Sequence, residues 1–153
     1  MLVPMTDDGD FDYKFLQNKL DLYRNYNSLK VGTFIAGSNI TGTIFDVDRI
    51  SVMCHKSGFL ACFDCAATSP YQDINMTGAT DHGFDFTPLS EDDKKLAYKD
   101  AIILSPHKLV GGPGSSGVLL AKKDILTSAK PHRLGGGIVF FVNELEHEFL
   151  SDK

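Results

Sequence analysis

The segment Ala101-Ile102-Ile103-Leu104-Ser105-Pro106-His107-Lys108 decides the expected fold of this chain. Its first four residues form a short apolar run, which is typical of a fully buried strand in a parallel sheet. In open α/β sheets, ligands bind outside the carboxyl ends of the strands, and Ser105, His107 and Lys108 follow such an end. A partly desolvated lysine can lose its proton, and its neutral amine can form a Schiff base with an aldehyde. The segment therefore predicts a ligand site with a reactive lysine.

Two earlier apolar runs, residues 31–36 and 59–63, predict further strands. The residues between them have helical spacing, so we expect a β-α-β unit with two parallel strands. Asn39 and Asp64 follow the ends of these strands. Because the carboxyl ends of parallel strands lie at one edge of a sheet, we expect both side chains near Lys108.

Three helices are predicted from apolar spacing and turn signals. The first begins near Phe11, and the third covers residues 91–98. The second follows a capping Thr41 or Thr43 and ends at Gly58.

The remaining segments complete an α/β pattern. Residues 67–100 form a long connection with an expected surface excursion over 75–88, which suits a crossover between parallel strands. Residues 117–121 follow the third strand too closely for a crossover helix, so they should form an antiparallel strand. Residues 138–142 are also strand-like, and an acidic tail follows at 144–153.

Three segments carry a family resemblance, and they occur in the family's order. Ser105-Pro106-His107-Lys108 with Gly112-Pro113-Gly114 resembles the cofactor-lysine segment of the class V aminotransferases. These pyridoxal-phosphate (PLP) enzymes include the cysteine desulfurases. Residues 36–42 (AGSNITG) are similar to the family's asparagine motif, and residues 63–67 (FDCAA) are similar to its aspartate motif.

The resemblance implies the architecture of PLP fold type I. This is a three-layer α/β/α sandwich, with a mostly parallel sheet that contains one antiparallel strand. Residues 1–153 would be a single partial domain, the cofactor-binding large domain without the N-terminal phosphate-loop segment and the C-terminal small domain. The resemblance also implies a homodimer for the complete protein.

The resemblance assigns a role to each candidate site residue. Lys108 would hold PLP as a Schiff base and move the substrate's α-proton. Asp64 would keep the pyridine nitrogen protonated, which makes PLP an electron sink. Asn39 would donate to the phenolic oxygen, and Ser105 and His107 would bind the phosphate. Many relatives have a glutamine three residues after the aspartate, where this chain has Ala67.

Composition argues against several other classes of protein. The 153 residues include 15 Lys and Arg against 20 Asp and Glu, a net charge of −5 without a basic stripe, so no nucleic-acid partner is expected. No apolar run approaches the roughly 20 residues that span a bilayer. The N-terminus has neither the basic nor the apolar region of a secretory signal. We therefore expect a cytoplasmic protein without a membrane partner.

Two other motifs are interpreted structurally. Cys62 and Cys65 form a C-x-x-C, but side chains three apart on a strand point to opposite faces and no second pair exists, so we expect small buried side chains. Residues 112–117 match G-x-G-x-x-G, but a predicted strand follows them where a dinucleotide site needs a helix. No metal site is expected, because the remaining histidines have no ligand spacing: His55, His82, His132 and His147.

The sequence thus predicts a PLP-dependent enzyme of the class V aminotransferase or cysteine desulfurase type. Its substrate would be an amino acid, and the reaction would be transamination, desulfuration or a related elimination. The main alternative is a non-catalytic remnant or interaction module with the same fold, and a nucleotide-binding α/β domain is a weaker one. The first two differ in whether Lys108, Asp64 and Asn39 converge on one cleft.

Overall fold

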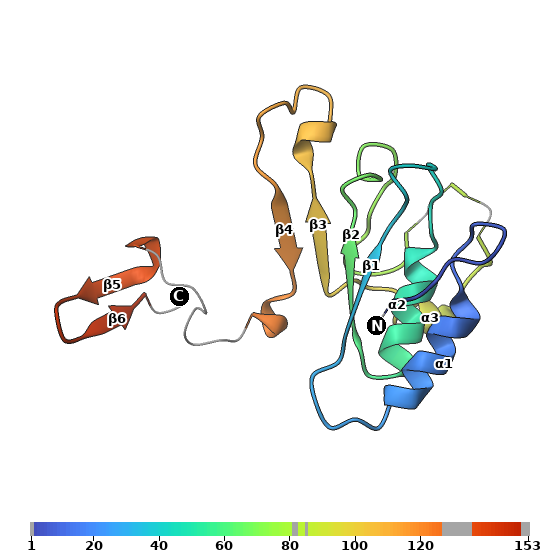
Figure 1. Cartoon of the computed structure of the whole chain (residues 1–153), viewed down its shortest axis with the longest axis horizontal. Coiled ribbons are helices and arrows are strands. Elements are labelled where there is room, and N and C mark those ends of the chain that lie inside the picture. The colour runs from blue at the N-terminus through green and yellow to red at the C-terminus, as the bar shows by residue number, and fades with distance from the viewer. Residues whose placement is uncertain (1, 81–82, 85, 127–135, 151–153) are drawn as a thin grey trace. The chain divides into compact units, whose positions relative to one another are not determined.

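A four-stranded sheet is the framework of residues 1–122, the first of two units into which the chain divides (Figure 1). The computed structural model describes residues 2–80, 83–84, 86–126 and 136–150. The strands lie in sequence order across the sheet: β1 (Val31–Ile35), β2 (Leu60–Asp64), β3 (Ala101–Leu104) and β4 (Val118–Ala121). The first three are parallel, and β4 is antiparallel to β3. The predicted α/β class and the mostly parallel sheet are confirmed.

Helix ends in this unit are fixed by side-chain caps. α1 (Tyr13–Tyr23) begins at Asp12, whose carboxylate accepts from the Phe15 N–H at 2.7 Å. α2 (Val47–Lys56) begins at Asp46, whose carboxylate accepts from the Arg49 N–H at 2.9 Å. α3 (Glu91–Lys94) begins at Ser90. Such caps satisfy N–H groups that have no partner within the helix.

The predicted second and third helices differ from the observed ones at their ends. Neither Thr41 nor Thr43 caps α2, because their hydroxyls bond to each other at 2.9 Å within the preceding turn. α3 ends at Lys94 instead of Tyr98, because the N–H groups of Leu96 and Ala97 donate to carbonyls three residues earlier. The i→i−4 hydrogen bonds of an α-helix are therefore absent at these two residues, and the chain continues in turns.

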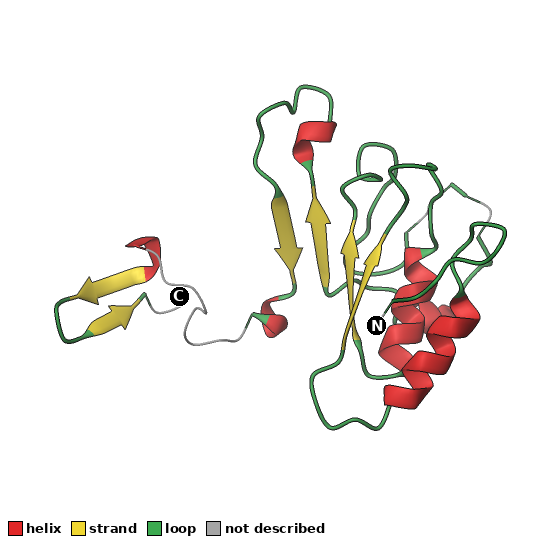
Figure 2. Ribbon diagram, viewed as in Figure 1, coloured by secondary structure: helices red, strands yellow, loops and turns green. Residues whose placement is uncertain are grey.

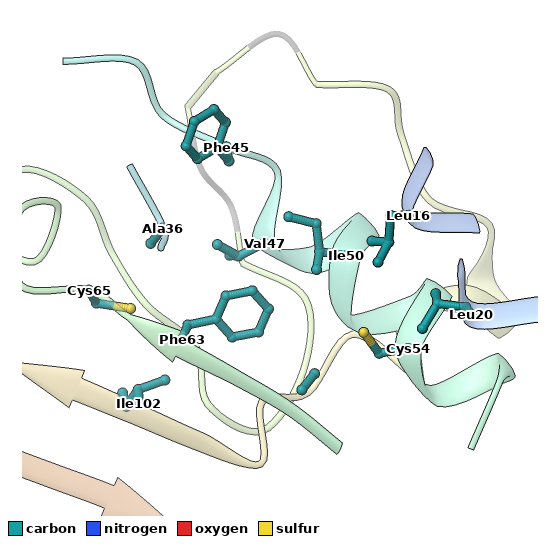
Figure 3. Close-up of a cluster of buried hydrophobic side chains, with 11 residues drawn as sticks. Leu16, Leu20, Ala36, Phe45, Val47, Ile50, Cys54, Phe63, Cys65 and Ile102 are labelled. Atoms are coloured by element: carbon teal, nitrogen blue, oxygen red, sulfur yellow. The ribbon is translucent and has the colours of Figure 1, made fainter. Parts of the chain in front are cut away.

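The core lies between the sheet and the two longer helices (Figure 3). Phe63 of β2 points from the sheet toward Val47 and Ile50 of α2. Leu16 and Leu20 add the buried stripe of α1 at helical spacing. Burial of this face holds both helices against the sheet.

The opposite face of the sheet carries exposed apolar side chains. Val31, Ile35, Ile103 and Leu119 retain 46%, 50%, 50% and 61% of their accessible surface. The helices of this unit lie on the other face (Figure 2). Among the described residues, two of the three predicted layers are therefore present, and the sheet's second face has no helical layer.

The second unit, residues 123–153, is organised by one hairpin. β5 (Val139–Val142) pairs antiparallel with β6 (His147–Phe149). The Asn143 side chain closes the turn, because its oxygen accepts from the N–H groups of Leu145 and Glu146 at 2.8 and 2.6 Å. The strand at 138–142 was predicted, but the segment predicted as an acidic tail contributes β6, since the turn returns it to β5.

Candidate cofactor site at the strand ends

Three loops at one edge of the sheet form the candidate site. They follow β1, β2 and β3, whose last residues lie in register: Ile35 is paired with Asp64, and Asp64 with Ile103. The β-α-β topology thus places the three predicted site segments at the same edge.

A pocket of about 650 Å³ lies among these loops. Asn39, from the loop after β1, and Lys108, from the loop after β3, both line it. Asn39 and Lys108 are far apart in the sequence, and the strand-end topology is what brings them to one pocket. Four hydroxyl-bearing residues also line the pocket: Ser38, Thr43, Thr68 and Tyr71.

The Asn39 loop is held by Ser38. The Ser38 hydroxyl accepts from the N–H groups of Ile40 and Thr41, both at 3.2 Å, and the Ser38 carbonyl accepts from the Gly42 N–H at 3.0 Å. These bonds keep the backbone around Asn39 in one tight turn at the pocket wall.

The loops after β1 and β2 pack closely at Gly37. A Cβ atom at this position would lie 2.6 Å from Cγ2 of Thr68 and 2.9 Å from the Thr43 carbonyl oxygen. Real Cβ contacts of this length are essentially absent from proteins. Glycine is therefore what lets these two pocket-forming loops meet.

Lys108 lies in a tight turn after β3. Residues Pro106–Lys108 form one turn of 3₁₀ helix, in which the Lys108 N–H donates to the Ser105 carbonyl at 2.9 Å. The Lys108 side chain is exposed, and among the described residues its ammonium makes no ion pair. Its amine is therefore accessible from the pocket.

The other three predicted site residues do not line this pocket. Ser105 is half-buried and His107 is exposed, both beside Lys108 in the chain. Asp64 is exposed at the end of β2, and its carboxylate accepts from the Ala66 N–H at 2.9 Å. Asp64 instead lines a smaller hollow of about 250 Å³ on the open sheet face, with Ile103 and Leu119. The structure thus joins Asn39 to Lys108 but leaves Asp64 outside their pocket.

The cysteines near the site are poor nucleophiles. Burial raises the pKa of the Cys65 thiol to about 11, and the nearby Asp64 carboxylate adds to the effect. Cys54, Cys62 and Cys65 are all free, and Cys62 and Cys65 differ in burial. The expectation of small buried side chains holds for Cys65 but not for Cys62, which is half-buried and lines the hollow on the open sheet face.

No metal centre is found in the described part of the chain. There, no group of three or more His, Cys, Asp or Glu side chains could hold an ion. Two of the histidines without ligand spacing, His82 and His132, lie outside the described residues.

Sequence reasoning did not single out the hydroxyl groups of the pocket. Thr43 is considered there only as a helix cap, Ser38 only as part of the asparagine motif, and Thr68 and Tyr71 only as part of the long connection. Their position just after strand ends was the available signal, because that edge is where ligands bind in such sheets.

A family model decides where this protein belongs. The model described as "Aminotransferase class-V" matches residues 1–152. The chain belongs to the class V aminotransferase family. The match includes all three segments on which the sequence resemblance rests, so that resemblance is confirmed.

Curated relatives of this class V family member are named as cysteine desulfurases. The chain is 29% identical over 135 residues to "Probable cysteine desulfurase 2" of Mycobacterium leprae, covering 88% of this chain and 26% of the relative. It is 26% identical over 140 residues to a probable cysteine desulfurase of Halalkalibacterium halodurans, covering 92% and 29%. The chain therefore spans somewhat more than a quarter of the length of these relatives.

A solved structure shares the fold. The apo cysteine desulfurase of Thermococcus onnurineus NA1 superposes with a TM-score of 0.71 at 19% identity, over 98% of this chain and 32% of that one. In the described part of our chain, none of the helices is long and apolar enough to cross a membrane.

Proposed function

We propose that this class V protein is a PLP-dependent enzyme that holds its cofactor on Lys108 and acts on an amino-acid substrate. The observation that carries the proposal is the pocket lined by both Asn39 and Lys108. The Lys108 amine can form an imine with an aldehyde, and the Asn39 amide can donate a hydrogen bond to a phenolic oxygen on the same aromatic ring.

The pocket suits PLP in size and in donor groups. Its volume of about 650 Å³ lies within the range of roughly 300–1,000 Å³ typical of cofactor sites. Its hydroxyl groups can donate to a phosphate, and the Lys108 amine can form an imine with an aldehyde. The residues present therefore fit the group.

Each predicted site residue keeps a proposed role. Lys108 would form the Schiff base with PLP and then move the proton at the substrate α-carbon. Asn39 would donate to the phenolic oxygen. Asp64 would act at the pyridine nitrogen, and Ser105 and His107 at the phosphate. All three lie at or just after strand ends, at the edge where the pocket lies, although they do not line it. When bound, PLP supplies an electron sink for charge at the α-carbon.

The reaction class is proposed from the relatives. Their printed names support desulfuration of cysteine, while the family's name includes transamination. We also propose that residues 1–153 form part of one cofactor-binding domain, and that the protein is a cytoplasmic homodimer.

PLP attachment to Lys108 is the direct test of this proposal. The purified chain is mixed with PLP, its absorbance spectrum is recorded, and the product is reduced with borohydride for peptide mass mapping. We expect a long-wavelength band and a reduced adduct on Lys108. Both should be lost in Lys108→Ala, because the amine is gone.

Surface lysines also react with aldehydes, so a matched control is needed. Lys95→Ala removes an exposed lysine that forms a surface ion pair with Asp92 at 2.8 Å, and it should leave the band and the Lys108 adduct intact. Adducts spread equally over surface lysines, with the same spectrum for both variants, would contradict the proposal and favour the non-catalytic remnant.

A further inference from the structure

Lys99 is the most deeply buried charged side chain among the described residues, with 1% of its surface exposed. Its ammonium donates to the Asp48 carboxylate, to the Gly78 carbonyl at 3.0 Å and to the Thr80 hydroxyl at 3.4 Å. A lysine ammonium has three donors, so all of them have acceptors. Burial lowers the pKa of Lys99, and the Asp48 carboxylate opposes this shift.

This buried pair closes the loop over residues 75–80. The second oxygen of Asp48 accepts from the Thr80 N–H at 2.6 Å. The Thr80 hydroxyl accepts from the Asn75 N–H at 3.1 Å, and the Lys99 N–H donates to the Met76 carbonyl at 2.9 Å. The loop is thus bonded to α2 on one side and to the residues before β3 on the other.

The loop continues directly from the pocket wall. Thr68 and Tyr71, which line the pocket, lie at the start of the segment whose far end is fixed at residues 75–80. Lys99 lies two positions before the start of β3, and β3 leads to Lys108. Both the wall after β2 and the strand that leads to Lys108 therefore have an anchor at the Asp48–Lys99 pair.

We infer that Asp48 and Lys99 are positioning residues for the proposed cofactor pocket: they fix the segment 67–80 and the entry to β3. The inference rests on the proposed function for its consequence, which is PLP affinity. Its structural part concerns order in the same segment, residues 67–80, and stands without PLP.

The double variant Asp48→Leu/Lys99→Met separates positioning from simple stabilisation. Replacing both members of a buried ion pair by apolar residues is often neutral for stability, whereas removing one member leaves an uncompensated charge. The double variant therefore keeps the core filled but removes the bonds to Gly78 and Thr80. If the pair positions the segment 67–80, this segment should become less ordered in the double variant while the rest of the first unit stays unchanged.

Hydrogen exchange measured by mass spectrometry is the first readout. Amides in residues 67–80 should exchange at least about tenfold faster in the double variant, while those of α1 stay unchanged. Thr80→Val gives a second, milder variant, which removes only the hydroxyl bonds to Lys99 and Asn75 and should raise exchange in the same segment. Lys95→Met, in an exposed pair, is the control and should change nothing.

PLP titration is the second readout. The apparent Kd should rise several-fold in the double variant, at unchanged global stability. Wild-type exchange rates in residues 67–80 of both variants would overturn the inference, as would a uniform rise across α1 and the sheet. If wild type binds no PLP at Lys108, the proposed function fails, while the exchange result still decides whether the pair orders the segment.

Discussion

At the scale of single residues, the geometry of Lys108 depends on a glycine that follows it. The Gly112 N–H donates to the Leu109 carbonyl at 3.0 Å, which brings the chain back over the turn. A Cβ atom at Gly112 would lie 1.8 Å from the Pro106 carbonyl oxygen. The turn that presents Lys108 therefore exists only with glycine at this position.

Gly112→Ala should displace the Lys108 turn. We expect a loss of stability of about 1–3 kcal/mol from the forced backbone shift, together with a marked loss of PLP attachment. Urea unfolding and borohydride mapping measure the two effects. Gly117→Ala is the matched control, because its Cβ would meet only the Leu104 oxygen at 3.8 Å. Equal behaviour of the two variants would show that the turn tolerates a side chain.

Cys54 should make stability depend on alkaline pH. Burial raises the pKa of its thiol from 9.0 to about 12. The folded chain holds this proton more tightly than the unfolded chain, so the contribution is complete below pH 9 and is lost as the pH rises toward 12. Between about pH 8 and about pH 10 the loss is about 1.4 kcal/mol.

Urea unfolding of wild type and Cys54→Ala, at about pH 8 and about pH 10, tests this linkage. The free energy of unfolding should fall more steeply with pH in wild type, whatever the absolute cost of the substitution. Parallel pH profiles for the two proteins would show that the thiol does not titrate differently on folding.

At the scale of elements, a buried His–Asp contact joins the end of α2 to the start of β3. Nε2 of His55 lies 2.9 Å from the Asp100 carboxylate, and both side chains are 5% exposed. The same carboxylate accepts from the Ala61 N–H of β2 at 2.8 Å. Asp100 therefore connects one helix and two strands.

Asp100→Ala should destabilise the first unit strongly. It leaves two buried donors without their acceptor, and breaking a buried pair in this way costs about 3–5 kcal/mol. Asp92→Ala is the control, because the Asp92 and Lys95 side chains are 91% and 76% exposed, and such surface pairs contribute about 0–1 kcal/mol. Chemical denaturation gives both values, and a similar small loss for each would refute the structural role of Asp100.

At the scale of the whole molecule, the exposed apolar face of the sheet is the surface where we expect association. Ile35 of β1 and Ile103 of β3, the strands on either side of β2, retain half of their surface. Exposed apolar patches of this kind mark interaction sites or cause association. The face is therefore where we expect the isolated chain to bind apolar probes or other copies.

Ile103→Lys should reduce both the binding of apolar probes and the association between copies of the chain. A charge at this position opposes burial of the face, so the fluorescence of an apolar dye and the concentration-dependent mass in sedimentation should both fall. Leu29→Lys serves as the control, since Leu29 is 80% exposed in the loop between α1 and β1. If both variants behave like wild type, the sheet face is not the surface that associates.

The sequence by itself determined the order and direction of the strands and the family. Apolar runs mark β1 to β4, and connection lengths separate parallel crossovers from the antiparallel return of β4, because both signals are local. The strand-end rule then put Asn39 near Lys108, and the shared pocket agrees with it.

Only the tertiary structure decided which side chains line that pocket and which charges are buried. The expected surface excursion includes Met76, which packs against the core, and Thr80, which bonds to Asp48. Asp64 lies at the predicted edge of the sheet, but it lines the hollow on the open sheet face instead of the pocket. Burial depends on contacts between residues far apart in the chain, such as Asp48 and Lys99. No local sequence pattern specifies which charged side chains will be buried as a pair.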